Sequence, residues 1–395
     1  MDKKMKVLQL TDAYYPVVDG VVAVVRNYIR QINKTDVCAV AAPSFKKKSG
    51  YVEENDVKVI RCKAMDAPEN YRSALPFFDR KFQKEIIAEN FDVLHAHSPF
   101  FLGRSALKIA KKQGIPVVAT LHTQYHRDFE RVLGKHNPLV KFMIRFISKV
   151  YKKADSVWTV SNTSKNFLRM YGYKGDVKVI RNATDYVYPE NADELIEKIN
   201  AMHGLKEQKN VFVFVGRMAM YKNLKLLCDS LKMLKGRGAE FKMLFVGGGF
   251  DYDELVAYAE KLDILDKCIF TGNVSDRELL QAYYLRGDLL LFPSTFDMAS
   301  IVQVEASAHK TAAVVVKDSC SGELIEDGVN GFLCEESAES YAEKLEELCS
   351  KPELVKEVGE NAYKTLYRTW DDLGKEVIET YKQVIKEYKE KNLKK

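Results

Sequence analysis

The chain has 395 residues, too many for one ordinary hydrophobic core, and its 46% apolar and 29% charged residues exclude an intrinsically disordered protein. No apolar run approaches the roughly 18 residues that cross a bilayer, and seven scattered cysteines without a CxxC pair argue against a zinc site or a disulfide framework. The formal net charge of +6 divides unevenly, because residues 1–190 carry 33 Lys+Arg and 19 Asp+Glu (+14) and the remainder carries 28 and 36 (−8).

Short apolar runs alternate with amphipathic segments through the first half of the chain. Strands are predicted at Val7–Leu10, Cys38–Ala42, Val57–Arg61, Val93–Ala96, Val117–Leu121, Val157–Val160 and Val177–Ile180. Helices are predicted between most of them, at Val21–Ile32, Phe82–Asn90, Leu102–Gln113 and Pro138–Lys153. Strands that alternate with helices imply right-handed crossovers and a parallel sheet with helices on both faces.

The same alternation restarts in the second half, after a predicted linker at Tyr186–Gln208. Strands are predicted at Val211–Val215, Lys242–Val246, Cys268–Thr271, Leu289–Phe292 and Ala312–Val316, with helices beginning at Asn223, Asp253, Asp276, Ile301 and Ser337. An amphipathic helix over about 372–391 is expected to pack back across the domains. We therefore predict an α/β protein with two doubly wound Rossmann-like domains facing a cleft, one over 1–188 joined by the C-terminal helix and one over 205–370.

Ligands of open α/β sheets bind beyond the carboxyl ends of the strands. This rule selects the loops Asp12–Gly20, His97–Gly103, His122–Tyr125, Gly216–Lys222, Gly247–Gly249 and Ser294–Glu305. Arg217 and Lys222 stand just before a helix, where two cations and free backbone N–H groups suit a diphosphate. A solvated basic loop is the alternative. The run Gly247–Gly249 permits close backbone approach, but it is not the GxGxxG of a dinucleotide site, which disfavours an NAD oxidoreductase.

Two acidic residues follow the strand that ends at Phe292. Asp297 lies in the predicted turn, and Glu305 lies about two turns into the next helix, among apolar neighbours that predict burial. One carboxylate suits a ribose diol and the other suits sugar hydroxyls, although two surface acids are the alternative. The nearby Asp251-Tyr252-Asp253 looks like a metal-binding DxD, but we interpret it as acids at a helix start, so no metal site is predicted.

Together these motifs resemble glycosyltransferase family 4, retaining enzymes of the GT-B fold, over nearly the whole chain. The matching segments are the acidic pair Asp297 and Glu305 with seven residues between them, the donor-phosphate motif Gly216–Lys222, the glycine turn Gly247–Gly249, and the later segments Ser321–Glu323 and Asp327–Phe332. In the first half they are the first-strand loop Thr11–Val21, the HxHS-like His95–Ser98, and His122, which corresponds to the family's sugar-contacting histidine.

The resemblance implies transfer of a hexose, with glucose expected, from a nucleotide sugar, with a UDP-sugar expected, by front-side displacement with retained configuration. It implies no obligatory cofactor or metal. The first domain would bind the acceptor and the second the donor. Catalytic roles are implied for His122, Asp297, Arg217 and Lys222. Donor-binding roles are implied for Gly20, Gly216, Gly248, Ser300, Ile301 and Glu305, and acceptor-side roles for Asp19, His97 and Tyr125.

The chain departs from the family pattern at three places. Asp297-Met298-Ala299-Ser300 lacks the glycines that commonly follow the first acid, and that acid is Asp rather than Glu. Arg181-Asn182-Ala183 replaces a Pro-Asn-Gly turn, and Cys320-Ser321-Gly322 replaces a Gly-Gly pair. The donor preference of this chain is therefore expected to differ from the family average. A catalytically silent nucleotide-sugar-binding protein stays an alternative.

A lipid acceptor at the membrane is the leading prediction for the second substrate. Residues 137–153 combine five basic side chains with apolar ones, as interfacial helices do, and Lys46–Lys48 adds a basic patch to the +14 half. A core-packed helix with a solvated basic face is the alternative. Ser98–Arg104 and Leu121–Tyr125 resemble the diacylglycerol glucosyltransferase branch. Surface-polysaccharide or lipid-linked oligosaccharide assembly is the competing function.

The expected location is the cytoplasm, with peripheral binding to the anionic inner face of the cell membrane. The apolar run Met5–Leu10 is too short for a secretory signal, and the scattered cysteines suit a reducing compartment. No nucleic-acid recognition motif accompanies the basic charge, so no nucleic-acid partner is expected. The sequence does not predict an oligomeric state.

Overall fold

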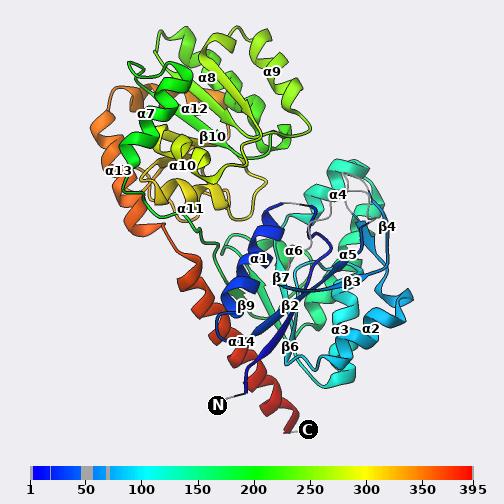
Figure 1. The fold of residues 1–395 in the computed structure, drawn as a ribbon. Coiled ribbons are helices and arrows are strands. Elements are labelled where there is room, and N and C mark those ends of the chain that lie inside the picture. Colours follow the sequence, from blue (N-terminus) through cyan, green and yellow to red (C-terminus); the bar gives the residue numbers. More distant parts are fainter. Residues whose placement is uncertain (1–2, 18, 46–56, 68–71, 394–395) are drawn as a thin grey trace. The chain divides into compact units, whose positions relative to one another are not determined.

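The computed structural model describes residues 3–17, 19–45, 57–67 and 72–393 (Figure 1). The chain divides into two units, one formed by residues 1–181 with 370–395 and the other by residues 182–369. These limits differ from the expected 1–188 and 205–370. The predicted linker Tyr186–Gln208 contains a helix, α7 (Ala192–His203), which ends at Gly204 in the left-handed conformation (φ +66°) and packs on α10 of the second unit.

Seven parallel strands form the sheet of the first unit, in the order β3-β2-β1-β6-β7-β8-β9. Their bounds are β1 (Lys6–Leu10), β2 (Val37–Pro43), β3 (Lys58–Cys62), β6 (Val93–Ala96), β7 (Val117–Leu121), β8 (Ser156–Thr159) and β9 (Val177–Val179). The central strands β6 and β7 are buried along their whole length, as a parallel sheet covered on both faces requires. All seven correspond to predicted strands. The hairpin of β4 (Ala64–Asp66) and β5 (Arg72–Ala74) was not predicted.

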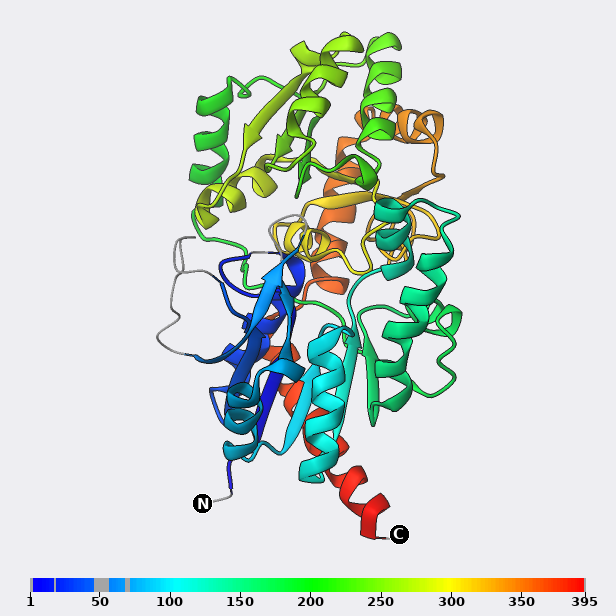
Figure 2. The ribbon, with the colours of Figure 1, turned by 90° about the vertical axis from the view of Figure 1, so that its right-hand side faces the viewer.

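Helices of the first unit include two that the sequence pattern did not reveal, α4 and α6. The bounds are α1 (Gly20–Ile32), α2 (Arg80–Ala88), α3 (Phe101–Gln113), α4 (Tyr125–Leu133), α5 (Pro138–Lys153), α6 (Lys165–Met170) and α14 (Trp370–Leu393). The predicted C-terminal helix is α14, which belongs to the first unit and packs against α1, as both views show (Figures 1 and 2). Gly374 permits this close approach, because a Cβ there would lie 2.6 Å from the Gln31 side chain.

Six parallel strands form the sheet of the second unit, in the order β12-β11-β10-β13-β14-β15. They are β10 (Val211–Val215), β11 (Lys242–Val246), β12 (Cys268–Gly272), β13 (Leu289–Phe292), β14 (Ala312–Val316) and β15 (Phe332–Cys334). The helices are α7, α8 (Leu224–Gly236), α9 (Tyr252–Lys261), α10 (Arg277–Arg286), α11 (Ile301–Ala308), α12 (Ala338–Cys349) and α13 (Pro352–Thr365), with a 3-10 turn η3 (Met220–Lys222) after β10. Of these, β15, α7 and α13 were not predicted.

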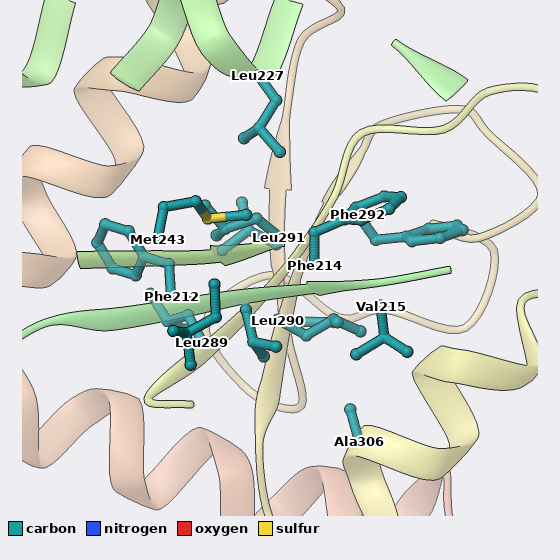
Figure 3. Packing of buried hydrophobic residues seen from close by; sticks show 14 of the residues in the cluster. Phe212, Phe214, Val215, Leu227, Met243, Leu289, Leu290, Leu291, Phe292 and Ala306 are labelled. Atoms are coloured by element: carbon teal, nitrogen blue, oxygen red, sulfur yellow. The ribbon is translucent and has the colours of Figure 1, made fainter. Parts of the chain in front are cut away.

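The core of the second unit is built on β10 and β13, whose side chains alternate between the two faces of the sheet (Figure 3). Phe214 stacks on Phe292 with ring centroids 6.0 Å apart. Leu227 of α8 and Ala306 of α11 approach these strands from opposite sides (Figure 3). Because both faces of the sheet are covered, only the ends of the strands can contact a ligand.

Strand order reverses once in each sheet, between β1 and β6 in the first and between β10 and β13 in the second. At such a topological switch point the loops after the two adjacent strands turn to opposite faces, which is where open α/β sheets bind ligands. The predicted loops at Asp12, His97, Gly216 and Ser294 all follow these four strands. The predicted doubly wound architecture is therefore confirmed in each unit.

Candidate functional site

A half-buried ion pair lies at the switch point of the second sheet. Lys222, at the end of η3, donates to both carboxylate oxygens of Asp297, at 3.0 and 3.1 Å. The two side chains are 13% and 28% exposed. Ser294 Oγ donates to Asp297 Oδ2 at 2.6 Å. Two predicted catalytic residues, separated by 75 positions in sequence, thus meet beyond β10 and β13. Arg217 is half-buried on the same loop as Lys222.

The glycines of this region serve the packing of two loops on each other. Gly216 and Gly247 have φ values of +144° and +136°, and a Cβ on Gly247 would lie 2.1 Å from the Gly216 carbonyl oxygen. A Cβ on Gly249 would lie 2.2 Å from the carbonyl oxygen of Met218, whose own N–H donates to Gly248 O at 2.9 Å. Close packing therefore requires glycine at Gly247 and Gly249, the two neighbours of Gly248. At Gly248 itself a Cβ would meet only ordinary contacts, the nearest at 3.5 Å.

Asp251 binds the Lys222 loop rather than capping its own helix. Its Oδ2 accepts from the Met220 backbone N–H at 2.7 Å, and its side chain makes no cap hydrogen bond in α9. Asp251 is nevertheless at the N-cap position of α9 and Asp253 is in its first turn, so the interpretation of these acids as helix-start residues is confirmed. Among the residues that the structure describes, no group of three or more His, Cys, Asp or Glu is arranged to hold a metal ion.

Glu305 is held from the neighbouring helix α10. The Tyr284 hydroxyl donates to Glu305 Oε2 at 2.7 Å. Burial raises the pKa of Glu305, and the hydrogen bond from Tyr284 opposes that shift. His309, one turn later, bonds through Nδ1 to the Glu305 carbonyl at 2.7 Å, and burial lowers its pKa to about 4. Glu305 is thus a half-buried carboxylate with a fixed side chain, less buried than the apolar surroundings in the sequence predicted.

The loop between Asp297 and α11 is fixed without glycine. Ser300 is the N-cap of α11, where its Oγ accepts from the Gln303 N–H at 3.3 Å, and Ile301 is the first helical residue. The Asn182 amide donates to the Ala299 carbonyl at 3.1 Å. The residue in the replaced Pro-Asn-Gly turn therefore stabilises the loop in which the glycines are missing.

In the first unit, two predicted histidines contact each other. His97 Nδ1 lies 2.8 Å from His122 Nε2, and the rings stack with centroids 5.0 Å apart. His97 is fully buried, whereas His122 is half-buried. Burial lowers the pKa of His122 to about 4 and that of His97 well below 6.5, so both rings are neutral at pH 7. His97 is therefore placed to act through His122 and not on a ligand.

Three other predicted residues have structural roles. Asp19 is the N-cap of α1, where its Oδ1 accepts from the Val22 N–H at 2.8 Å, and Gly20 is the first residue of that helix. Tyr125 was expected in a loop but begins α4 and is buried, with its ring 5.4 Å from that of Phe100. The basic patch Lys46–Lys48 lies outside the described residues.

Asp12 begins one of the loops that the sequence pattern selected, but no role was predicted for it. It follows β1 at the switch point of the first sheet, where its N–H donates to Ser98 Oγ at 3.0 Å. Its buried Oδ2 has no hydrogen-bond partner among the described residues, and burial raises the pKa of Asp12 to about 7. The signal available in the sequence was its position directly after a buried strand.

Two family models match the chain over adjoining ranges. One is described as Glycosyltransferase Family 4 and matches residues 18–187, and the other as Glycosyl transferases group 1 and matches residues 186–365. An alpha-monoglucosyldiacylglycerol synthase of Streptococcus pneumoniae is 23% identical over 388 residues, 96% of this chain and 86% of the relative. Its namesake from Acholeplasma laidlawii is 24% identical over 374 residues, 91% of this chain and 92% of the relative.

Solved structures share the fold of the whole chain. The Anabaena protein Alr3699/HepE in complex with UDP-glucose superposes with a TM-score of 0.75 at 18% identity, covering 96% of this chain and 100% of that one. Within the described residues, none of the helices has the length and apolar character needed to cross a membrane.

Proposed function

Because the chain belongs to glycosyltransferase family 4, whose members are retaining hexosyltransferases that use nucleotide sugars, we propose that it transfers glucose from UDP-glucose to a membrane lipid such as diacylglycerol. The observation that carries this proposal is the Lys222–Asp297 pair at the switch point of the second sheet. It places a cation and a hydroxyl-binding carboxylate side by side, at the position where an α/β sheet binds nucleotides.

Each residue of the second unit has a role that its chemistry suits. Arg217 and Lys222 neutralise the diphosphate as its negative charge grows in the transition state. Glu305, fixed by Tyr284, accepts hydrogen bonds from the ribose hydroxyls. Asp297 and His122 orient the transferred sugar. Retention by front-side displacement requires no covalent nucleophile from the protein.

UDP-glucose is proposed as the donor because it is bound in the Anabaena structure, whose fold this chain shares. Diacylglycerol is proposed as the acceptor because both relatives quoted above are named alpha-monoglucosyldiacylglycerol synthases.

The surface of α5 supports membrane contact. Leu139 and Phe142 are 46% and 64% exposed, and Val132 at the end of α4 is 64% exposed. Lys141 and Arg145 are exposed on the same helix, which contains no acidic residue. An exposed apolar strip flanked by cations is the pattern of a helix that lies in the interface of an anionic bilayer.

The test is incubation with labelled UDP-glucose and anionic vesicles that do or do not contain diacylglycerol. We expect labelled glycolipid only in the vesicles that contain diacylglycerol. Label that enters a lipid-linked oligosaccharide instead, with none in diacylglycerol, would select the competing function. Neither transfer nor slow release of free glucose would indicate a silent nucleotide-sugar-binding protein.

A further inference from the structure

Six polar side chains of the first unit form a continuous series of hydrogen bonds that runs from Thr120 of β7, through Tyr381 of the C-terminal helix α14, to His122. Five of them are at most 2% exposed: Gln9, His95, His97, Thr120 and Tyr381. The bonds join Thr120 Oγ1 to His95 Nε2 (2.6 Å), His95 Nδ1 to the Tyr381 hydroxyl, that hydroxyl to Gln9 Nε2 (3.2 Å), Gln9 Oε1 to His97 Nε2 (2.7 Å) and His97 Nδ1 to His122 Nε2 (2.8 Å). We call this series the histidine relay.

Gln9 gives the histidine relay a direction, because an amide has one oxygen that only accepts and one nitrogen that only donates. The nitrogen of Gln9 faces the Tyr381 hydroxyl and, at 3.5 Å, the sulfur of Cys38. Its oxygen therefore faces His97 and accepts the hydrogen on His97 Nε2. Since His97 is neutral, its Nδ1 carries a lone pair and accepts the hydrogen on His122 Nε2.

Tyr381 completes the arrangement at the other end. Its hydroxyl oxygen accepts from Gln9 and its hydrogen is donated to His95 Nδ1, so His95 donates from Nε2 to Thr120. Turning the Gln9 amide over would reverse every bond of the series together, because hydroxyls and neutral histidines can each donate or accept, and His122 would then carry its hydrogen on Nδ1. The placement of the Gln9 nitrogen toward Tyr381 and Cys38 is therefore what selects the tautomer of His122.

We propose that Gln9, whose amide nitrogen lies against Tyr381 and Cys38, acts through His97 to fix the tautomer of His122 so that its free Nδ1 only accepts hydrogen bonds. His122 then matches a hydroxyl of the transferred sugar, and it opposes a carboxylate or phosphate oxygen in the same place. Gln9, His97 and Tyr381 are positioning residues in this scheme. The identity of the ligand rests on the proposed function, whereas the tautomer does not.

Nuclear magnetic resonance of protein labelled with ¹⁵N in histidine tests the tautomer without any ligand. Long-range ¹H–¹⁵N spectra distinguish a protonated ring nitrogen from a bare one, and His122→Gln assigns the signals. We expect the wild type to carry the hydrogen of His122 on Nε2. Gln9→Met should abolish this preference. Tyr381→Phe, which is a milder change, should weaken it because the amide can then turn.

Tyr171→Phe is the matched control, since it removes a buried tyrosine hydroxyl that contacts a different histidine, His126. It should leave the tautomer of His122 unchanged. A hydrogen on Nδ1 of His122 in the wild type would overturn the proposal. So would an unchanged His122 tautomer in both Gln9→Met and Tyr381→Phe.

Calorimetric binding of UDP-glucose and its monodeoxy analogues tests the role in sugar recognition. One analogue should bind about tenfold more weakly than UDP-glucose to the wild type, the factor that one hydrogen bond corresponds to. That difference should vanish in Gln9→Met and persist in His97→Asn, whose Oδ1 can accept from His122. If no analogue shows it, the recognition step is refuted. Failure of sugar transfer in the vesicle assay would refute the proposed function and leave the tautomer result standing.

Discussion

Asp297 shows how a short acidic side chain can be held in a loop that contains no glycine. Its carboxylate accepts from Lys222 and Ser294, and the Asn182 amide holds the carbonyl of Ala299 two residues later. Side-chain hydrogen bonds thus hold the backbone of this loop in place. One consequence is that the charge of Lys222 is already fixed at the end of β10 before any diphosphate arrives.

Replacing Lys222 by methionine should lower kcat by about 10²-fold, because the developing charge on the diphosphate would lose a fixed cation. Steady-state rates of glucose transfer measure this effect. Lys225→Met is the control, since Lys225 is half-exposed and pairs with Glu254 on the surface of the same unit. Equal rates for Lys222→Met and the wild type would remove Lys222 from the mechanism.

Glu305→Gln should weaken UDP binding by about 1–3 kcal/mol, the value of a charged hydrogen bond. Calorimetry measures the affinity, and the exposed Glu278→Gln serves as control. Because burial raises the pKa of Glu305, its carboxylate takes up a proton at a higher pH than an ordinary glutamate does. UDP affinity of the wild type should therefore fall on acidification earlier than for an exposed carboxylate, and that fall should disappear in Glu305→Gln.

At the scale of elements, the loops after β10 and β11 pack closely against each other. Gly247→Ala should destabilise the protein by about 2 kcal/mol or more, because its backbone has a positive φ and the new Cβ would clash with the Gly216 carbonyl. Denaturant unfolding measures the change. Gly236→Ala is the matched control at the end of α8, where a Cβ meets nothing within 4 Å, and it should be neutral or slightly stabilising. Similar stability for both variants would contradict the clash.

Helix α5 gives a prediction about the membrane. Phe142→Ser together with Leu139→Ser should reduce flotation with anionic vesicles several-fold, because each removes exposed apolar surface that would enter the interface. Binding should also fall with added salt, since basic side chains attract the anionic lipid. Met202→Ser, an exposed apolar position on α7, is the control and should float as the wild type does.

The strands were predictable because buried parallel strands are continuous apolar runs, and the residue limits expected for β11, β13 and β14 agree with the structure. Helix α7 was missed because its segment is charged and only three of its apolar side chains, Ala192, Leu195 and Ile199, are buried. Strand β15 has three residues, too few for a period to show. The resemblance indicated Lys222, Asp297 and Glu305, but no local pattern could predict contacts such as His95 with Tyr381, 286 residues apart.

For the whole molecule, neutral buried histidines predict sensitivity to acid. Burial lowers the pKa of His122 and His309 to about 4, and an unfolded histidine titrates near 6.5. Between these values the unfolded chain binds protons that the folded chain does not, so stability falls as pH decreases from about 6.5 toward 4. The loss is about 1–2 kcal/mol per histidine at pH 5. Asp12, with its pKa raised to about 7, opposes this effect, as do Asp155, Asp288 and Glu305, whose pKa values burial also raises.

Urea unfolding at pH 7 and pH 5 tests this expectation, with a lower midpoint at pH 5. His136→Gln, at an exposed position, should leave the difference between the two midpoints unchanged. His309→Gln should make it smaller, because that variant removes one of the protons taken up on unfolding. A midpoint that rises on acidification would show that the carboxyl groups dominate.

The first unit is assembled from both ends of the chain, since α14 at residues 370–393 supplies the tyrosine that pairs with Gln9 and His95. During synthesis, the ribosome therefore completes the second unit before the first has its last helix. Until α14 has been made, Gln9 and His95 lack their partner, and the nascent first unit is expected to hold His122 in no fixed tautomer. A polypeptide that stops short of Tyr381 would keep the second unit but lack the ordered acceptor on His122, so synthesis of α14 becomes a late step in the maturation of the first unit.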